Sequence, residues 1–121
     1  MSEATKNLAL KLILYPVTDA AKAKTFYNAL LGTEPYADSP YYIGYRIGEQ
    51  EIGLVPNGQK NGIPMPHGYC DVDDIKQSIK TLVDAGATLH QDVRDVGGGL
   101  LVALLKDPDG NITGLRQGKS N

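Results

Sequence analysis

The chain has 121 residues, of which 41% are hydrophobic, and a formal net charge of −2 from 12 basic and 14 acidic residues. This length and composition suit one compact globular domain. No dense run of Lys or Arg is present to grip a phosphate backbone, and no apolar run reaches the roughly 20 residues that cross a bilayer. We therefore expect a cytoplasmic protein that binds neither nucleic acid nor membrane. The single cysteine, Cys70, excludes an intrachain disulfide and a metal site built from several thiolates.

The first predicted elements are a strand and a helix. Residues 8–14 alternate leucines with other side chains, which is typical of a strand, and Pro16 is expected to end it. From Asp19 to Leu31 apolar residues recur at helical spacing, with Asp19 suited to the N-cap and Gly32 to the C-terminal cap. The side of this helix expected to be buried carries Ala23, Phe26, Tyr27, Leu30 and Leu31.

A hairpin is predicted next. Residues 41–47 and 50–55 are strand-like and are joined by Gly48-Glu49, a two-residue loop with glycine first. This turn pairs Arg46 with Glu51 and Gly44 with Gly53. Alternating faces would then hold apolar side chains under the helix and the two glycines on the opposite side. Residues 57–62 have no periodic pattern and are expected to form an exposed linker.

The same order of elements is predicted again after the linker. Val17-Thr18-Asp19 before the first helix is echoed by Val72-Asp73-Asp74, and Gly32 after it by Gly86, with offsets of 55 and 54 residues. The second set of predicted elements is a strand at 67–72, a helix at 74–85 with Ile75, Ile79, Leu82 and Val83 buried, and strands at 88–93, 100–106 and 111–116.

The repeat indicates one structural unit present twice. We predict a single α+β domain over residues 1–121, made of two tandem β-α-β-β-β modules, with module one at about 8–56, a linker at about 57–64 and module two at about 65–117. Helices stacked on one face of each sheet leave the other face free. The expected fold is therefore a curved mixed sheet around a cleft, with the helices on the outer face.

This order of elements resembles the vicinal-oxygen-chelate superfamily, which includes glyoxalase I, extradiol dioxygenases, methylmalonyl-CoA epimerase, fosfomycin-modifying enzymes and bleomycin-resistance proteins. The resemblance extends from Leu8 to Gln117. The segments that carry it are Phe26-Tyr27, Leu30-Leu31-Gly32 and Asp107-Pro108-Asp109-Gly110-Asn111. Relatives of this size usually act as homodimers, so the resemblance implies a homodimer here as well.

In metal-dependent relatives, the resemblance implies ligands on the first and last strand of each module. The corresponding positions in this chain are Leu12, Gly53, His67 and Gly114. One ligand-type residue does not hold a divalent metal, since such sites need about three protein ligands. We therefore expect no metal and no other cofactor.

The glycines suggest a ligand site instead. Gly53 and Gly114 on the cleft side, with Gly44 beside Gly53, would open volume for an organic molecule, although a strand glycine also marks a bulge or a close backbone approach. The residues expected to contact the ligand are His67, Tyr69, Tyr42, Gly53, Gly114, Leu12, Glu51 and Arg116. Two of these residues have a simpler alternative role. Glu51 would be the cross-strand partner of Arg46, and Arg116 would be a solvated residue.

His67 has three open roles, which are ligand contact, general acid/base catalysis near neutral pH and a structural hydrogen bond. The first functional hypothesis is a metal-independent protein that holds a small organic molecule, of the bleomycin-resistance type. The second is a lyase, isomerase or dioxygenase that uses a non-standard metal site of His67, Glu51 and Asp71, or His67 alone as acid/base. The third is a ligand-sensing or structural dimer module. Fold similarity does not choose among them, because one scaffold supports all three.

Overall fold

A computed structural model describes residues 10–118 of the chain. Leu8, with which the predicted first strand begins, lies outside the described residues. The described chain divides into two compact units, one of residues 11–67 and one of residues 68–118 with Leu10. The division falls close to the boundary between the two predicted modules.

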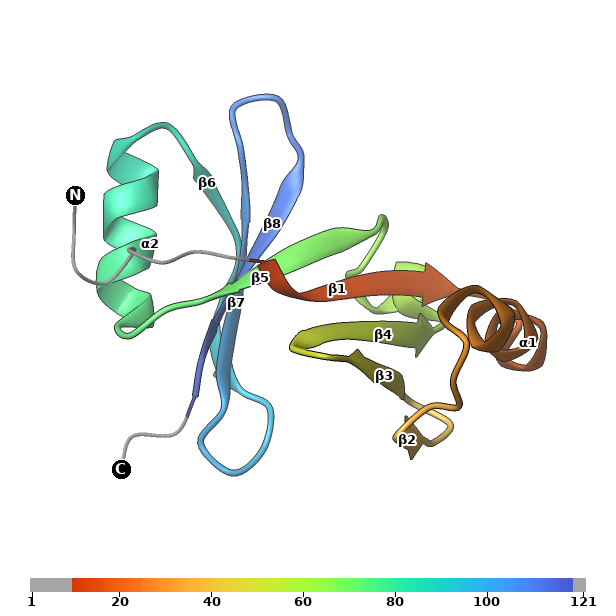
Figure 1. The fold of residues 1–121 in the computed structure, drawn as a ribbon. Helices are drawn as coiled ribbons and strands as arrows, with labels where there is room; N and C mark the ends of the chain where they lie inside the picture. Colours follow the sequence, from red (N-terminus) through yellow and green to blue (C-terminus); the bar gives the residue numbers. More distant parts are fainter. Residues whose placement is uncertain (1–9, 119–121) are drawn as a thin grey trace. The chain divides into compact units, whose positions relative to one another are not determined.

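The first unit has four strands and one α-helix (Figure 1). The strands lie in the order β2-β3-β4-β1, with β1 parallel to β4 and the other pairs antiparallel. The short β2 was not expected from the sequence. The elements are β1 (Leu10–Val17), α1 (Ala20–Leu31), β2 (Ala37–Asp38), β3 (Ile43–Ile47), β4 (Gln50–Pro56) and the 3₁₀ helix η2 (Gly58–Asn61).

Helix α1 begins and ends as predicted. The Asp19 side chain accepts a hydrogen bond from the Lys22 backbone N–H at 3.0 Å, which satisfies one of the unpaired donors of the first turn. Gly32 has a φ of 70°, the left-handed conformation that glycine adopts without strain.

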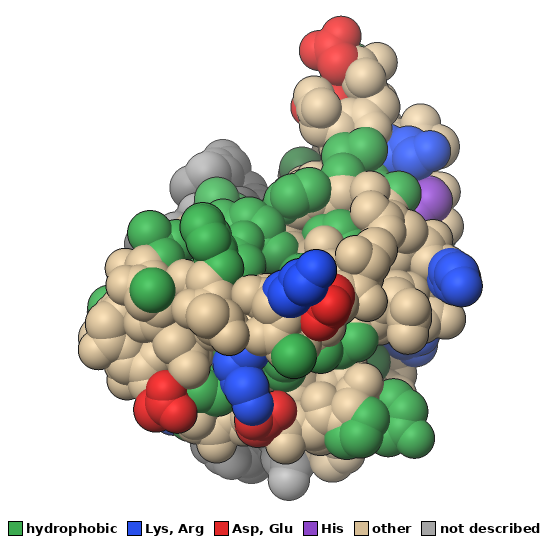
Figure 2. Space-filling view, turned by 90° about the vertical axis from the view of Figure 1, so that its right-hand side faces the viewer, with side chains coloured by type: hydrophobic (Ala, Val, Ile, Leu, Met, Phe, Trp, Pro, Cys, Tyr) green, Lys and Arg blue, Asp and Glu red, His purple; other side chains and the backbone are tan. Residues whose placement is uncertain are grey.

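The buried side of α1 is narrower than predicted. Ala23, Tyr27 and Leu31 pack on the core formed by strands β3 and β4, but Phe26 is 59% and Leu30 62% exposed. Phe26 and Leu30 each come one residue before a side chain that packs on the sheet, so they lie at the edge of the buried side. The predicted five-residue stripe is therefore wider than the surface of the helix that contacts the sheet. In the space-filling view from the side of α1, hydrophobic side chains lie at the surface among charged ones (Figure 2).

The predicted hairpin is confirmed in its register. Arg46 pairs with Glu51 and Gly44 with Gly53, and Gly48 in the turn has a φ of 60°. Tyr45 lies on the face of the hairpin under the helix and is fully buried, and its hydroxyl donates to Asn28 Oδ1 of α1 at 2.6 Å. The glycine pair therefore lies on the face that α1 does not cover.

Two details of the first unit differ from the prediction. Strand β1 runs through Pro16 to Val17, because a proline lacks only the N–H donor and is tolerated near the end of a strand. The expected exposed linker contains the turn η2, and its Gly58 is buried where a Cβ would lie 2.9 Å from the Pro16 side chain. Gly58 thus permits a close approach between η2 and β1.

The second unit repeats the arrangement. Its strand order β5-β8-β7-β6 matches the order β1-β4-β3-β2 of the first unit, with β5 parallel to β8. Both units are therefore β-α-β-β-β, and the fold class is α+β, as predicted. The elements are β5 (His67–Asp71), α2 (Ile75–Asp84), β6 (Thr88–Asp95), β7 (Leu101–Lys106) and β8 (Ile112–Gln117).

Helix α2 packs on one face of its own strands (Figure 1). Asp74 caps it by accepting from the Gln77 backbone N–H at 3.1 Å. Ile75, Ile79 and Leu82 lie in the core as predicted, whereas Val83 is 42% exposed, because Val83 lies past the edge of the contact with the sheet. Neither helix within residues 10–118 is long and apolar enough to span a membrane.

Candidate functional site

The eight ligand-site candidates fall into two groups, and each group lies within one unit. The second unit holds Tyr69, Gly114 and Arg116. The first unit holds Leu12, Tyr42, Glu51, Gly53 and, at its boundary, His67.

In the first unit, a tyrosine ring lies across the paired glycines. A Cβ built on Gly53 would lie 2.5 Å from Tyr42 Oη, and one built on Gly44 would lie 2.8 Å from Tyr42 Cε2. Real Cβ atoms essentially never come within 3.0 Å of a non-bonded heavy atom, so the ring occupies the place of two missing side chains. Leu14, the partner of Gly53 on β1, closes the same space from the other side.

A polar group lies beside this ring. Tyr36 donates its hydroxyl to Glu51 Oε2 at 3.0 Å, and the Arg46 guanidinium lies 4.4 Å from the centre of the Tyr36 ring. Burial, followed by the bond to Glu51, raises the pKa of Tyr36, while Arg46 and a hydrogen bond from Tyr42 oppose the rise. The predicted pair of Arg46 and Glu51 is present, with 4.0 Å between Nη2 and Oε2. Tyr36 was absent from the predicted site, since nothing in its local pattern indicates that it reaches β4.

The second unit has the equivalent contact of a side chain with a strand glycine. Tyr69 pairs with Gly114 across β5 and β8, just as Leu14 pairs with Gly53 across β1 and β4. A Cβ on Gly114 would lie 2.5 to 2.7 Å from three carbons of the Tyr69 ring, and Tyr69 is only 5% exposed. Burial raises the pKa of Tyr69, against the opposing effect of Arg94 and Arg116.

The expectation that the glycines open volume is therefore wrong for this structure. At Gly44, Gly53 and Gly114 the space of the missing side chain is filled by a ring or a leucine methyl group. The alternative of a bulge or a close backbone approach does not describe these positions either, because the strand register is regular there and side chains of the same unit lie against the glycines.

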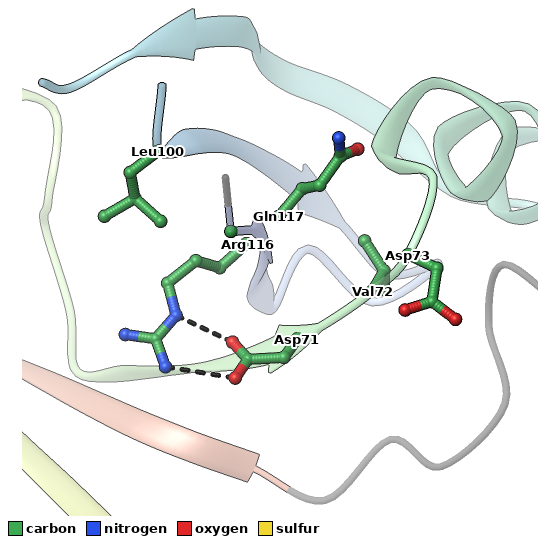
Figure 3. Close-up of a pocket in the computed structure, with 7 residues that line it drawn as sticks. Asp71, Val72, Asp73, Leu100, Arg116 and Gln117 are labelled. Atoms are coloured by element: carbon green, nitrogen blue, oxygen red, sulfur yellow. Dashed lines mark hydrogen bonds and ion pairs between the residues drawn. The ribbon is translucent and has the colours of Figure 1, made fainter. Parts of the chain in front are cut away.

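A pocket of about 510 Å³ lies in the second unit, where β5 and β8 end and α2 begins (Figure 3). Arg116 lines it and is held by Asp71 through two hydrogen bonds, from Nε to Oδ1 at 2.7 Å and from Nη2 to Oδ2 at 3.2 Å. Such a two-point pair fixes the plane of the guanidinium. The other seven predicted ligand residues are not among those that line this pocket.

The remaining walls of the pocket mix apolar and polar groups. Leu100 and Val72 supply hydrocarbon, and the Gln117 side chain points toward α2, where its Oε1 accepts from the Ile75 backbone N–H at 2.7 Å (Figure 3). None of these residues was among the predicted ligand contacts. Their common signal is position at the ends of strands, which a pattern within one strand does not reveal.

His67 and Leu12 are both buried, at 4% and 8% exposure. The Nδ1 of His67 lies 3.1 Å from the carbonyl oxygen of Met65. A carbonyl only accepts, so Nδ1 carries the proton in this contact. Among the three roles open to His67, the structural hydrogen bond is therefore present.

The residues at the four positions where relatives place metal ligands do not fit a metal ion. Leu12, Gly53 and Gly114 offer no side-chain donor atom, and rings and methyl groups lie over the two glycines. Within residues 10–118 no three His, Cys, Asp or Glu side chains gather closely enough to hold one elsewhere.

Comparison with solved structures first defines the class of fold. A hypothetical protein from Bacillus halodurans C-125 is 21% identical with a TM-score of 0.77, over 96% of this chain and 98% of its own. A methylmalonyl-CoA epimerase variant from Streptomyces coelicolor, in complex with 2-nitronate-propionyl-CoA, is 17% identical with a TM-score of 0.75, over 94% of this chain and 100% of its own. A structure described as NAD-dependent benzaldehyde dehydrogenase from Legionella pneumophila is 21% identical with a TM-score of 0.71, over 89% of this chain and 98% of its own. At these identities the similarity shows the fold alone.

The family follows from the sequence itself. Residues 9–114 match the Glyoxalase/Bleomycin resistance protein/Dioxygenase superfamily, so the chain belongs to that superfamily, as the resemblance predicted. No curated protein sequence matches the chain at a significant level.

Proposed function

We propose that this protein binds a small organic molecule with its own side chains and without a metal ion. The observation that carries the proposal is the chemistry of the four ligand positions, where Leu12, Gly53 and Gly114 have no side-chain donor atom. The phenol rings over the glycines add to it, because a ligand-bearing side chain at either position would collide with them. A superfamily member without these donors retains a scaffold suited to binding.

The pocket beside Arg116 supports the binding part of the proposal. Its volume of about 510 Å³ lies within the range of about 300 to 1,000 Å³ typical of small-molecule sites. The Arg116–Asp71 pair offers charge-assisted hydrogen bonds of fixed direction, and Leu100 and Val72 offer apolar contact. A molecule with a hydrocarbon part and a polar group complementary to this pair matches these walls.

The enzyme alternative receives less support from the side chains. The non-standard metal site would need His67, Glu51 and Asp71. Both carboxylate oxygens of Asp71 already accept hydrogen bonds from Arg116, and Glu51 accepts one from Tyr36. A metal would have to replace these contacts as well as supply its own. The expected homodimer stays a prediction, and light scattering on the purified protein tests it.

The experiment combines metal analysis with thermal unfolding. Purified protein should contain no stoichiometric transition metal, and EDTA should leave the Tm unchanged. Small organic compounds that raise the Tm of the wild type, by stabilising the folded state, should lose that effect in Leu100→Ala. The matched control is Leu89→Ala, which removes an exposed leucine from β6 of the same unit and should keep the effect. A stoichiometric metal that disappears in His67→Ala would overturn the proposal.

A further inference from the structure

A second pocket lies in the first unit, between helix α1, the end of strand β1 and the turn η2. Its volume is about 470 Å³, which is in the range of about 300 to 1,000 Å³ typical of small-molecule sites. None of the residues that line it lines the pocket beside Arg116. Its wall includes Pro16 and Val17 of β1, Lys22, Phe26 and Tyr27 of α1, and Gln59 of η2.

The turn η2 is held against β1 and forms one wall of this pocket. The Asn57 N–H donates to the Val17 carbonyl oxygen at 2.9 Å, and Gly58 is buried against Pro16. Asn57 has a φ of 58°, and it is the one residue other than glycine with a positive φ in the part of the chain that the structure describes. Asparagine adopts this conformation more readily than most residues. These contacts fix the backbone of Gln59 at the edge of the pocket.

Helix α1 contributes two aromatic rings in a fixed arrangement. The Phe26 and Tyr27 rings lie 5.0 Å apart between centroids at an interplanar angle of 83°, which is an edge-to-face contact. Tyr27 also contacts Tyr15 of β1, with 5.4 Å between ring centroids. Phe26 is nevertheless 59% exposed. A ligand ring that covers Phe26 therefore meets a surface whose geometry is already set, so little conformational freedom is lost on binding.

The repeat indicates that the fold does not require an aromatic residue at position 26. Helices α1 and α2 begin at the equivalent residues Ala20 and Ile75, so Phe26 corresponds to Thr81 of the second unit. The Thr81 hydroxyl donates to the Gln77 carbonyl oxygen of its own helix at 3.0 Å. A large apolar side chain at the surface, where the same fold accepts threonine, indicates contact with another molecule.

Lys22 gives the pocket a positive charge. Its side chain forms no ion pair with any residue between 10 and 118. Asp19 also lines the pocket, but its carboxylate caps the helix by accepting from the Lys22 backbone N–H at 3.0 Å. The Lys22 ammonium and the Gln59 side-chain amide can both donate to a carboxylate. The charged group that suits this pocket is therefore an anion.

We propose that this pocket is a second small-molecule site of the protein, which binds a compound with one aromatic ring and one carboxylate group. The ring covers Phe26 and Tyr27, and the carboxylate pairs with Lys22. Phe26 supplies the apolar contact, and Lys22 supplies the selectivity for an anion. The site is separate from the proposed function, which concerns the pocket beside Arg116 in the second unit.

The test compares phenylacetate with phenylacetamide, which has nearly the same shape but no charge. Backbone amide NMR of the full chain follows Ala23, Phe26, Tyr27 and Gln59 during titration with each compound. In the wild type, phenylacetate should bind about two- to fivefold more tightly than phenylacetamide, which is the range expected for one exposed ion pair. Lys22→Met should abolish this difference. The matched control is Lys76→Met, which removes an exposed lysine from the first turn of α2 and should keep the difference.

A second variant tests the aromatic wall. Phe26→Thr introduces the residue that the second unit has at the equivalent position, so the protein should fold. It should weaken the binding of both compounds by at least about threefold. Leu100→Ala, in the pocket beside Arg116, should leave both affinities unchanged. If Phe26→Thr does not fold, Phe26→Ala takes its place, with the same expectation.

The outcomes separate this site from the rest of the molecule. Saturable shifts at the four amides that depend on Lys22 and Phe26 in this way support the site. Absence of saturable shifts there, equal phenylacetate binding by the wild type and both variants, or shifts confined to residues near Arg116 would overturn the proposal. The proposed function would stand in each of these cases, because the two pockets share no residue.

Discussion

Gly114→Ala tests the close contact between Gly114 and the Tyr69 ring in the second unit. A methyl group on Gly114 would lie 2.5 to 2.7 Å from three carbons of the Tyr69 ring, whereas carbon atoms in contact normally lie about 3.5–4.0 Å apart. Tyr69 is buried within β5, so the ring cannot move into solvent and the strands must shift instead. Overpacking of this kind lowers the free energy of unfolding by about 1–3 kcal/mol. The reduced flexibility of the unfolded chain offsets about 0.4–1 kcal/mol of this loss. We expect a net destabilisation of about 1.5 kcal/mol.

Thermal and urea unfolding measure this effect. At about 3–6 °C per kcal/mol for a domain of this size, Tm should fall by about 4–9 °C. Gly118→Ala is the control, because nothing lies within 4 Å of its added Cβ, and it should change stability by less than about 0.5 kcal/mol. In a Tyr69→Leu background the same Gly114→Ala change should cost clearly less. A Gly114→Ala protein as stable as the wild type, or an equal loss in both backgrounds, would refute the reasoning.

Three further changes have defined outcomes. Tyr45→Phe should destabilise the first unit by about 1–2 kcal/mol in urea unfolding, because the buried hydroxyl donates to Asn28 Oδ1 at 2.6 Å. Asp74→Ala should cost about 1 kcal/mol by the same assay, through loss of the α2 cap, and unchanged stability would contradict that role. Hydrogen bonds from Asn111 lower the pKa of Asp107 below 3.8, so their stabilisation is present above pH 3.8 and is lost as pH falls through the lower folded value. Carboxyl NMR titration should show this midpoint rise toward 3.8 in Asn111→Ala.

Periodicity and repeats predicted the fold well because they report on backbone pairing. The register that pairs Gly44 with Gly53 follows from a two-residue turn and alternating faces, and the structure has it. The helix caps at Asp19 and Asp74 follow from local hydrogen bonding within one turn. The width of the buried helix stripe was overestimated at Phe26, because the area of contact with a sheet depends on the partner.

The candidate site was less predictable because it depends on where side chains go. The sequence placed the glycines correctly on the uncovered face but could not show that Tyr42 and Tyr69 fold back over them. Likewise, Arg116 pairs with Asp71 because β5 and β8 are parallel and adjacent. The two residues are 45 positions apart in the sequence, so no local pattern indicates the pair. The cytoplasmic location and the homodimer stay predictions.

The contact of Tyr69 with Gly114 also constrains how this protein can evolve. A carboxylate at position 114 would be destabilising as a first step, since any side chain there meets the Tyr69 ring. Replacing Tyr69 by a smaller residue first would instead lose the packing of a buried ring without yet gaining a ligand. Whichever of the two substitutions comes first is therefore disadvantageous. A lineage with this pair is kept away from metal chemistry at position 114 by an epistatic barrier as well as by its present residues.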